Sequence, residues 1–308
     1  MAALRNTLAG LALGVCIGSV GSLLLVVEKE ETDKQREIPA VVLPKDETQI
    51  VRHEALRYGL PSHQNVHVRS GYVVSYDYRT RNAAWVLEHL TKDSLQVVDD
   101  TDRTKSNFAV DYATPEPFRV HPNVFIKSGY DKGHLAPARD MTTSQKAMNE
   151  SFLMTNISPQ VGAGFNRGYW SRLEGFVRHL AFQYDALYVI TGPLFLPKKN
   201  KKTGEYNISY PVLGTPPDAI AVPTHFFKVL LAQKKDGSFL TAGFILPNQV
   251  IPENKNLLDF LTPLDVIEKY SGLLFFNKLQ NVQKLELCKE TKCSLAGAYK
   301  RALSSGDK

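Results

Sequence analysis

The chain has 308 residues, of which 43% are hydrophobic and 22% charged, the usual balance of a folded soluble domain. This composition excludes a disordered chain, a collagen and a polytopic membrane protein. Three cysteines are too few for a disulfide-dense scaffold or a four-cysteine zinc site. The formal net charge of +6 favours an anionic partner, either nucleic acid or a membrane surface, without choosing between them.

The chain begins with an uncharged run over residues 6–27, preceded by a single arginine, Arg5. About 20 apolar residues in a helix cross a bilayer, so the run predicts an N-terminal transmembrane helix, with residues 1–27 as a membrane anchor or targeting segment. A cleaved signal peptide is the second interpretation and a matrix presequence the third, because no small-residue cleavage site stands out and the segment is poor in arginine. Arg5 before the run and acidic residues after it, from Glu28 onward, place the rest of the chain on the non-cytoplasmic or non-matrix side.

Residues 28–49 are polar, contain Pro39 and Pro44 and show no hydrophobic period, which predicts a flexible tether. From Ile50 onward we find no internal repeat and no linker long enough to divide the chain. Residues 50–308 are therefore predicted to form a single domain.

Within this domain, β-branched and aromatic runs predict strands over residues 71–79, 83–90, 152–157, 187–195, 220–232 and 239–247. Apolar residues three and four apart predict helices over residues 144–149, 170–182 and 264–270, and the basic tail is predicted to be partly helical. Residues 93–122 are polar and irregular. Strands, then helices, then strands predict an α+β fold around a mainly antiparallel sheet.

The segment with the most chemical information is Asp131-Lys132-Gly133-His134. A neutral imidazole is the usual base that activates water near pH 7, so His134 is a candidate general base. Lys132 beside it is a candidate for neutralising a phosphate. Alone, the motif is a weak signal, because a single histidine is more often packed or exposed than catalytic.

A second group of residues follows downstream. Asn166, Trp170 and Glu174 are four apart and predict one side of a helix that begins near Asn166, which is alternatively the helix N-cap. A carboxamide oxygen and a carboxylate are hard ligands that suit Mg²⁺. Zinc is disfavoured because no cluster of thiolates or histidines accompanies them.

Four segments together resemble the DNA/RNA non-specific nucleases with a ββα-metal active site, and within that family the mitochondrial endonuclease G branch. They are YDKGHLAPARDM, SQKAMNESFLMTNISPQVGAGFNRGYWSRLE, YVITGPLFLPKK and IAVPTHFFKVLLA. The resemblance extends from Gly71 to Phe276 and includes the spacing between segments. It implies a Mg²⁺-dependent endonuclease, with Mn²⁺ as a substitute metal, that hydrolyses phosphodiester bonds of DNA and RNA and leaves 5′-phosphate ends.

The resemblance also implies roles for individual residues. His134 matches the general base, and Asn166 matches the asparagine that ligates the single Mg²⁺. Glu174 matches the helix glutamate that holds metal-bound waters. Asn156 matches the asparagine that steadies the active-site strand, and Arg81 matches an arginine that contacts the substrate phosphate.

Lys132 departs from the family motif, which has arginine at this position. Lysine keeps the charge but loses the bidentate fork, so we expect activity to survive with altered phosphate contact. Three alternatives stay open: a 5′-exonuclease-like relative, a catalytically weakened nucleic-acid-binding homologue and a secreted scavenging nuclease. The exonuclease branch carries an added C-terminal domain for which this chain has little room.

For the cell, the resemblance implies a homodimer in mitochondria, anchored in the inner membrane through residues 6–27 with its nuclease domain in the intermembrane space. It further implies relocation to the nucleus on release and DNA degradation during apoptosis.

Other features have plain structural interpretations beside functional ones. The basic cluster Lys198, Lys199, Lys201 and Lys202 is either a nucleic-acid contact or a solvated hairpin tip. Cys288 and Cys293 form a disulfide or remain free thiols. His225 and the two tryptophans are expected to be structural.

Overall fold

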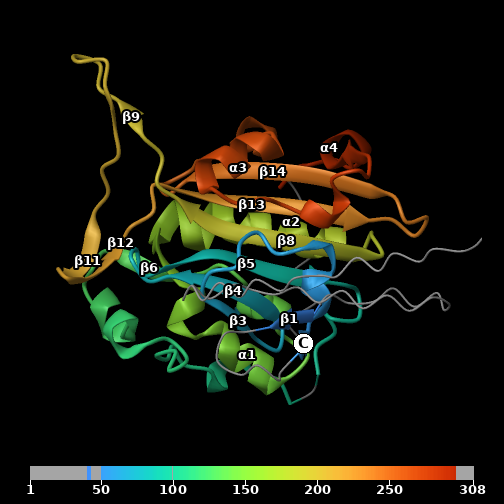
Figure 1. Cartoon of the computed structure of the whole chain (residues 1–308), viewed down its shortest axis with the longest axis horizontal. Coiled ribbons are helices and arrows are strands. Elements are labelled where there is room, and N and C mark those ends of the chain that lie inside the picture. Colours follow the sequence, from blue (N-terminus) through green and yellow to red (C-terminus); the bar gives the residue numbers. More distant parts are fainter. Residues whose placement is uncertain (1–39, 43–49, 99, 296–308) are drawn as a thin grey trace, which may run out of the picture.

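A seven-stranded sheet runs through the centre of the molecule. The computed structural model describes residues 40–42, 50–98 and 100–295. The strand order is β15–β14–β13–β8–β5–β4–β3, and each neighbouring pair is antiparallel except β14 with β15 (Figure 1). The strands are β3 (Val66–Val68), β4 (Tyr72–Asp77), β5 (Asn82–Leu90), β8 (Ala186–Leu194), β13 (His225–Gln233), β14 (Phe239–Pro247) and β15 (Lys284–Glu286).

Smaller strand pairs and helices lie around this sheet. The pairs are β1 (Ala40–Val42) with β2 (Ile50–Arg52), β6 (Tyr130–His134) with β7 (Ile157–Val161), β9 (Lys198–Lys199) with β10 (Tyr206–Asn207), and β11 (Val212–Thr215) with β12 (Asp218–Ala221). The α-helices are α1 (Gln145–Ser151), α2 (Ser171–Ala181), α3 (Leu264–Ser271) and α4 (Leu287–Glu290). Short helical turns are η1 (Glu54–Tyr58), η2 (Arg103–Lys105), η3 (Glu116–Phe118), η4 (Pro122–Phe125), η5 (Ala138–Asp140), η6 (Met154–Asn156), η8 (Leu257–Phe260) and η9 (Asn277–Leu279), and the wider turn η7 (Gly162–Trp170) leads into α2. Helices beside a large antiparallel sheet confirm the predicted α+β class.

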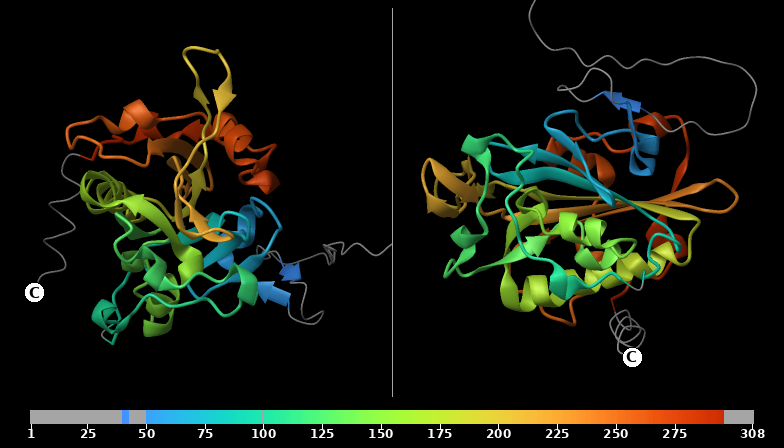
Figure 2. Two further views of the ribbon diagram at one scale, coloured as in Figure 1. Left: turned by 90° about the vertical axis from the view of Figure 1, so that its left-hand side faces the viewer. Right: turned by 90° about the horizontal axis from the view of Figure 1, so that it is seen from below.

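Alternation along the central strands gives the sheet two apolar faces. On β5, Val86 and Leu90 belong to the core on one face, while Trp85 and Leu87 belong to the core on the other, as the period of two in a strand requires. Helix α2 covers the first face, and η1 and α3 cover the second (Figure 2). The molecule is therefore a layered structure with the sheet in the middle.

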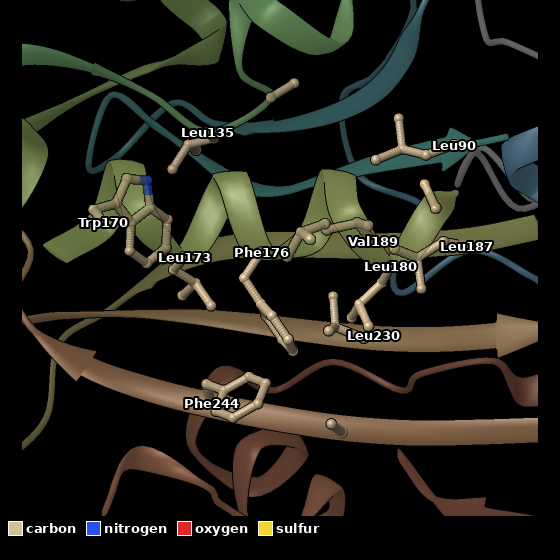
Figure 3. Packing of buried hydrophobic residues seen from close by; sticks show 14 of the residues in the cluster. Leu90, Leu135, Trp170, Leu173, Phe176, Leu180, Leu187, Val189, Leu230 and Phe244 are labelled. Carbon is tan, nitrogen blue, oxygen red and sulfur yellow. The ribbon is translucent and has the colours of Figure 1, made fainter. Parts of the chain in front are cut away.

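Helix α2 packs on the sheet through one apolar stripe. Leu173, Phe176 and Leu180 are spaced three and four apart and are at most 3% exposed. In Figure 3, Leu180 lies beside Leu187 of β8 and Phe176 points toward Phe244 of β14, and all three side chains belong to the same core cluster. Burying each side chain of this size contributes about 2 kcal/mol. This packing fixes the helix on the sheet, and with it every polar side chain that the helix carries.

Most predicted elements are present with shifted ends. The segments 71–79, 83–90, 187–195 and 239–247 overlap β4, β5, β8 and β14, and the predicted helices overlap α1, α2 and α3. The strand predicted over 220–232 is interrupted, since β12 ends at Ala221 and β13 begins at His225. Pro223 lies in the gap, where it has no N–H to donate to a ladder.

The strand predicted over residues 152–157 is wrong. Met154–Asn156 form the turn η6, and only Ile157 belongs to β7. The apolar composition favours a strand, but the fully buried side chain of Asn156 bonds to the backbone of Ala136 and Ser151 and holds the chain in a turn. A tertiary contact therefore overrides the local preference.

The last described segment is tied to the core beside α2. Strand β15 adds to β14 in parallel and leads into α4. Cys288 and Cys293, for which the sequence left both states open, form a disulfide. Leu287, Cys293 and Leu295 are buried in the same core as the α2 stripe.

In the part of the chain that the structure describes, no helix is long and apolar enough to cross a membrane. The transmembrane helix predicted over residues 6–27 lies outside the described residues, as does most of the predicted tether. Within that predicted tether, β1 forms a strand pair with β2.

Candidate active site

Strands β6 and β7 and helix α2 form one structural unit. The two strands pair antiparallel, with Lys132 opposite Pro159 and His134 opposite Ile157. Strand β7 continues directly into η7 and then α2. This succession of strand, strand and helix is the ββα arrangement that the resemblance implies.

A cavity of about 330 Å³ is lined by residues from β6, η7 and α2. Four of the predicted site residues, Lys132, His134, Asn166 and Glu174, line it together. Glu174 is the one carboxylate among the lining residues, and the cations are Arg103, Lys132, Arg139, Arg167, Arg172 and Arg178. This excess of positive charge suits a polyanionic ligand.

His134 is packed against two aromatic rings. Its ring centroid lies 4.8 Å from that of Phe152 and 5.5 Å from that of Phe108. Burial, with a smaller contribution from Arg103, lowers the pKa of His134 to about 3. The imidazole is therefore neutral at pH 7, and its Nε2 has no hydrogen-bond partner among the described residues. A neutral imidazole in this state is able to accept a proton from water.

Asn156 braces the loop that follows His134. Its Oδ1 accepts a hydrogen bond of 2.9 Å from the backbone N–H of Ala136, and its Nδ2 donates to the carbonyl oxygens of Ala136 at 2.9 Å and Ser151 at 2.8 Å. The backbone N–H of Leu135 also donates to the carbonyl oxygen of Asn156. These contacts lie outside the cavity and fix the end of β6 that presents the imidazole.

Asn166 is oriented by the acidic residue of the same motif. Its Nδ2 donates a 2.8 Å hydrogen bond to Oδ2 of Asp131, and Arg167 pairs with the same carboxylate. Because the amide hydrogens face Asp131, the carboxamide oxygen is the atom left for a ligand. Gly164, with a φ of +79°, interrupts the helical turn just before Asn166, so the helix begins where the spacing predicts. No side-chain hydrogen bond caps this helix, and the amide of Asn166 bonds to Asp131 instead.

The oxygen atoms of Asn166 and Glu174 fit a hydrated Mg²⁺. No group of three or more histidine, cysteine or acidic side chains that could hold a metal occurs among the described residues, so a cation here would keep most of its waters, as Mg²⁺ does. Within the same residues, the Glu174 carboxylate makes no hydrogen bond. Burial raises the pKa of Glu174 to about 7, and the nearby cations Lys228 and Arg178 oppose this rise.

The ammonium group of Lys132 lies near two aromatic rings. Its Nζ lies 5.0 Å from the ring centroid of Phe108 and 5.9 Å from that of Phe125. Such contacts attract a cation toward the ring face. The lysine therefore stays at the cavity without the fork that an arginine would offer.

Arg81, the predicted phosphate contact, does not line the cavity, and its guanidinium bonds to groups within the fold. Its guanidinium is only 10% exposed and donates to the carbonyl oxygens of Pro117, Pro217 and Ala219, besides pairing with Asp218 at 2.9 Å. These acceptors use the fork of the guanidinium. Arg81 therefore holds η3 to the β11–β12 hairpin.

Sequence reasoning missed the cavity arginines Arg103 and Arg178. Arg178 carried a usable signal, because it lies four residues after Glu174 on the same helix; it pairs with Asp140 at 2.8 Å. Arg103 lies in the irregular segment 93–122, where no periodicity places a side chain. The four lysines near β9 do not line the cavity and lie on an arm that projects from the sheet (Figures 1 and 2).

Comparison with known proteins agrees with this geometry. The family model of the DNA/RNA non-specific endonucleases matches residues 52–282. A mitochondrial nuclease of Saccharomyces cerevisiae is 38% identical over 94% of this chain and 91% of its own length. A nuclease of Syncephalastrum racemosum is 48% identical over 74% of this chain and 72% of its own length.

Two further likenesses concern endonuclease G. The mitochondrial endonuclease G of Homo sapiens is 40% identical over 72% of this chain and 73% of its own length. A chain of the solved EndoG/EndoGI inhibitory complex superposes with a TM-score of 0.72 at 38% identity, covering 75% of this chain and 94% of that one. The chain therefore belongs to the DNA/RNA non-specific endonuclease family and is a nuclease, an enzyme that hydrolyses nucleic acids.

Proposed function

We propose that the protein is a Mg²⁺-dependent endonuclease that cleaves phosphodiester bonds in both DNA and RNA and leaves 5′-phosphate ends. The observation that carries this proposal is the shared cavity. Its lining includes the neutral imidazole of His134, the side chains of Asn166 and Glu174, and the cations Lys132, Arg103 and Arg178.

In the proposed reaction, His134 takes a proton from a water molecule as the water attacks the phosphorus in line. The bond from phosphorus to the 3′-oxygen breaks, and this oxygen takes a proton from a second water molecule, which leaves a 3′-hydroxyl and a 5′-phosphate. Asn156 keeps the imidazole in place by bracing the loop behind it. The rings of Phe108 and Phe152 exclude water from one side of the imidazole and hold its orientation.

Charge on the phosphate is met by the chain's own cations. Lys132, Arg103 and Arg178 line the cavity and offset negative charge that grows on the phosphoryl oxygens. Asn166 through its carboxamide oxygen, and Glu174 through water, would hold the cation; when bound, Mg²⁺ polarises the phosphate and stabilises the leaving oxygen. Contacts to phosphate carry no sequence information, which supports cleavage without sequence preference.

The cellular part of the proposal is a homodimer anchored in the mitochondrial inner membrane through residues 6–27, with the nuclease domain in the intermembrane space and release to the nucleus during apoptosis. The names of the relatives, mitochondrial nuclease and mitochondrial endonuclease G, support the mitochondrial location. The uncharged N-terminal run supports the anchor.

The test is cleavage of supercoiled plasmid and single-stranded RNA by the full chain, purified in detergent, with Mg²⁺ or with EDTA. We expect Mg²⁺-dependent cutting of both substrates, and His134→Ala should slow it by about 10²–10⁴-fold, the usual contribution of a general base. His121→Ala, a change at an exposed histidine outside the cavity, should cut at the parental rate.

Other outcomes would refute the proposal in distinct ways. Binding of nucleic acid without cutting would indicate the catalytically weakened homologue. Release of short products only from 5′ ends would indicate the 5′-exonuclease-like relative. Parental cutting by His134→Ala would refute the assignment of the base.

A further inference from the structure

Three polar side chains lie next to one another on the sheet face that α2 covers. They are Glu88 on β5, Thr191 on β8 and Lys228 on β13, and each is at most 1% exposed. In the register, Lys228 lies directly opposite Thr191. Glu88 lies two residues beyond the partner of Thr191 on β5, so all three point to the same face. This polar cluster interrupts an otherwise apolar core.

The ammonium group of Lys228 is held from two sides. Its Nζ donates a 2.6 Å hydrogen bond to Oγ1 of Thr191 and lies 5.0 Å from the ring centroid of Trp170, at the start of α2. The described residues give it no direct ion pair. Burying an ammonium group is costly unless opposite charges lie within reach.

Three carboxylates supply that charge at longer range. Burial lowers the pKa of Lys228, while the attraction of Glu88, then of Glu174 and then of Asp140 raises it. Glu88 is within the sheet, and its Oε1 has no hydrogen-bond partner among the described residues. Glu174 lies on α2, four residues after Trp170, and lines the cavity. Lys228, in the middle of the sheet, thus attracts Glu174, the one carboxylate that lines the cavity.

A purely structural role explains the cluster poorly. Replacing a buried charged pair by apolar side chains of similar volume is often neutral or stabilising, so packing alone gives no reason to keep Lys228. The reason must lie in what the charge does to a neighbour. Of Glu88, Glu174 and Asp140, Glu174 is the one that lines the cavity.

We propose that Lys228 is a positioning residue for Glu174. Held by Thr191 and the Trp170 ring, its ammonium attracts the Glu174 carboxylate and fixes where that carboxylate lies at the cavity wall. Lys228 thereby sets how tightly the cavity holds a divalent cation. The inference rests on the proposed function, in which Glu174 holds the cation through water. It adds a residue outside the cavity that affects how tightly the cation binds.

The first test is Lys228→Met in the full chain, with Mn²⁺ binding measured without substrate by electron paramagnetic resonance of the free ion. Loss of an outer partner of a metal site typically weakens binding by about 10–100-fold, which is the expected result. The Mg²⁺ concentration for half-maximal plasmid nicking should rise in parallel. The control is Lys234→Met, since Lys234 follows the same strand and pairs with Glu290 at the surface; it should bind Mn²⁺ as the parent does.

A double variant separates positioning from stability. Glu88→Gln with Lys228→Met removes both charges from the sheet, so no unpaired carboxylate is left there. We expect its melting temperature to lie close to the parental value while Mn²⁺ binding stays weak. A folded double variant that binds Mn²⁺ as tightly as the parent overturns the proposal.

Two further outcomes are decisive. If Lys228→Met fails to fold both alone and combined with Glu88→Gln, the test is Thr191→Val, which removes the hydrogen bond to Lys228 and keeps the charges. Weaker Mn²⁺ binding by Thr191→Val supports the proposal, and unchanged binding overturns it. If the parent neither binds Mn²⁺ nor cuts plasmid, the proposed function fails and this inference with it. If the parent does both and Lys228→Met is unaffected, only the positioning role fails.

Discussion

Asn156→Ala is expected to loosen the loop that carries His134. The side chain makes three buried hydrogen bonds, two to Ala136 and one to Ser151, and each contributes about 1 kcal/mol net. Alanine also leaves those backbone groups buried without partners, which raises the expected loss of unfolding free energy to about 3–5 kcal/mol. A domain with the usual unfolding free energy of ~5–15 kcal/mol stays folded after this loss at low temperature.

The same change should lower activity beyond its effect on folding. The bonds to Ala136 hold the backbone just after His134, and a displacement of the base by ~1 Å costs about 100-fold in rate. We therefore expect plasmid nicking at saturating Mg²⁺ to fall by about 100-fold at a temperature where the variant is fully folded. Urea unfolding of the same preparations measures the stability change.

The matched control is Asn149→Ala on α1. Asn149 also makes side-chain hydrogen bonds, to Ser106 and Gln145, but it is exposed. Its loss should change the unfolding free energy by about 0.5 kcal/mol and leave nicking unchanged. If Asn156→Ala behaves like this control in both assays, the bracing role is refuted.

Further predictions concern the cations and pH. Lys132→Met should lower kcat/KM on plasmid by about tenfold or more, whereas Lys132→Arg should match or exceed the parent; an equal loss in both would show that charge is not what the site uses. Arg81→Met should lower the unfolding free energy by about 2–4 kcal/mol with KM unchanged, because its guanidinium bonds within the fold; a higher KM at unchanged stability would restore the phosphate role. The folded state keeps His134 neutral down to its pKa of about 3, while the unfolded chain binds a proton below about 6.5, so stability should fall as pH drops through that window. At pH 5 the parent should lose up to about 2 kcal/mol more than His134→Ala in urea unfolding, and equal losses would contradict the buried neutral imidazole.

The sequence predicted the elements whose signal is local. Period-two and period-three-to-four patterns identified β4, β5, β8, β14 and α2, because these segments bury one face regardless of what covers it. The turn at Met154–Asn156 was missed because its cause includes hydrogen bonds between Asn156 and Ala136, which is 20 residues away in the sequence.

The sequence predicted those site residues that belong to recognisable motifs. His134, Asn166 and Glu174 line one cavity, as the resemblance implied. Arg81 and Arg103 show the limit: composition does not distinguish an arginine that bonds inside the fold from one that faces a ligand. The acceptors around Arg81 belong to residues distant in the sequence, so only the folded chain shows these hydrogen bonds.

Strand geometry determines which side chains of β6 face the cavity and which face η7. Successive side chains of a strand point to opposite faces. Lys132 and His134 share one face, where both contact Phe108. Asp131 faces the turn η7, where it bonds to Asn166, and Gly133 lies against β7, where a Cβ would be 2.2 Å from the side chain of Gln160. A shift of one residue would exchange the two faces, so Lys132 and His134 together would turn away from Phe108 and Asp131 would turn away from Asn166. The two-residue period thus assigns each residue of the motif to its contact. The antiparallel pairing of β6 with β7 brings η7, and with it Asn166, beside Asp131.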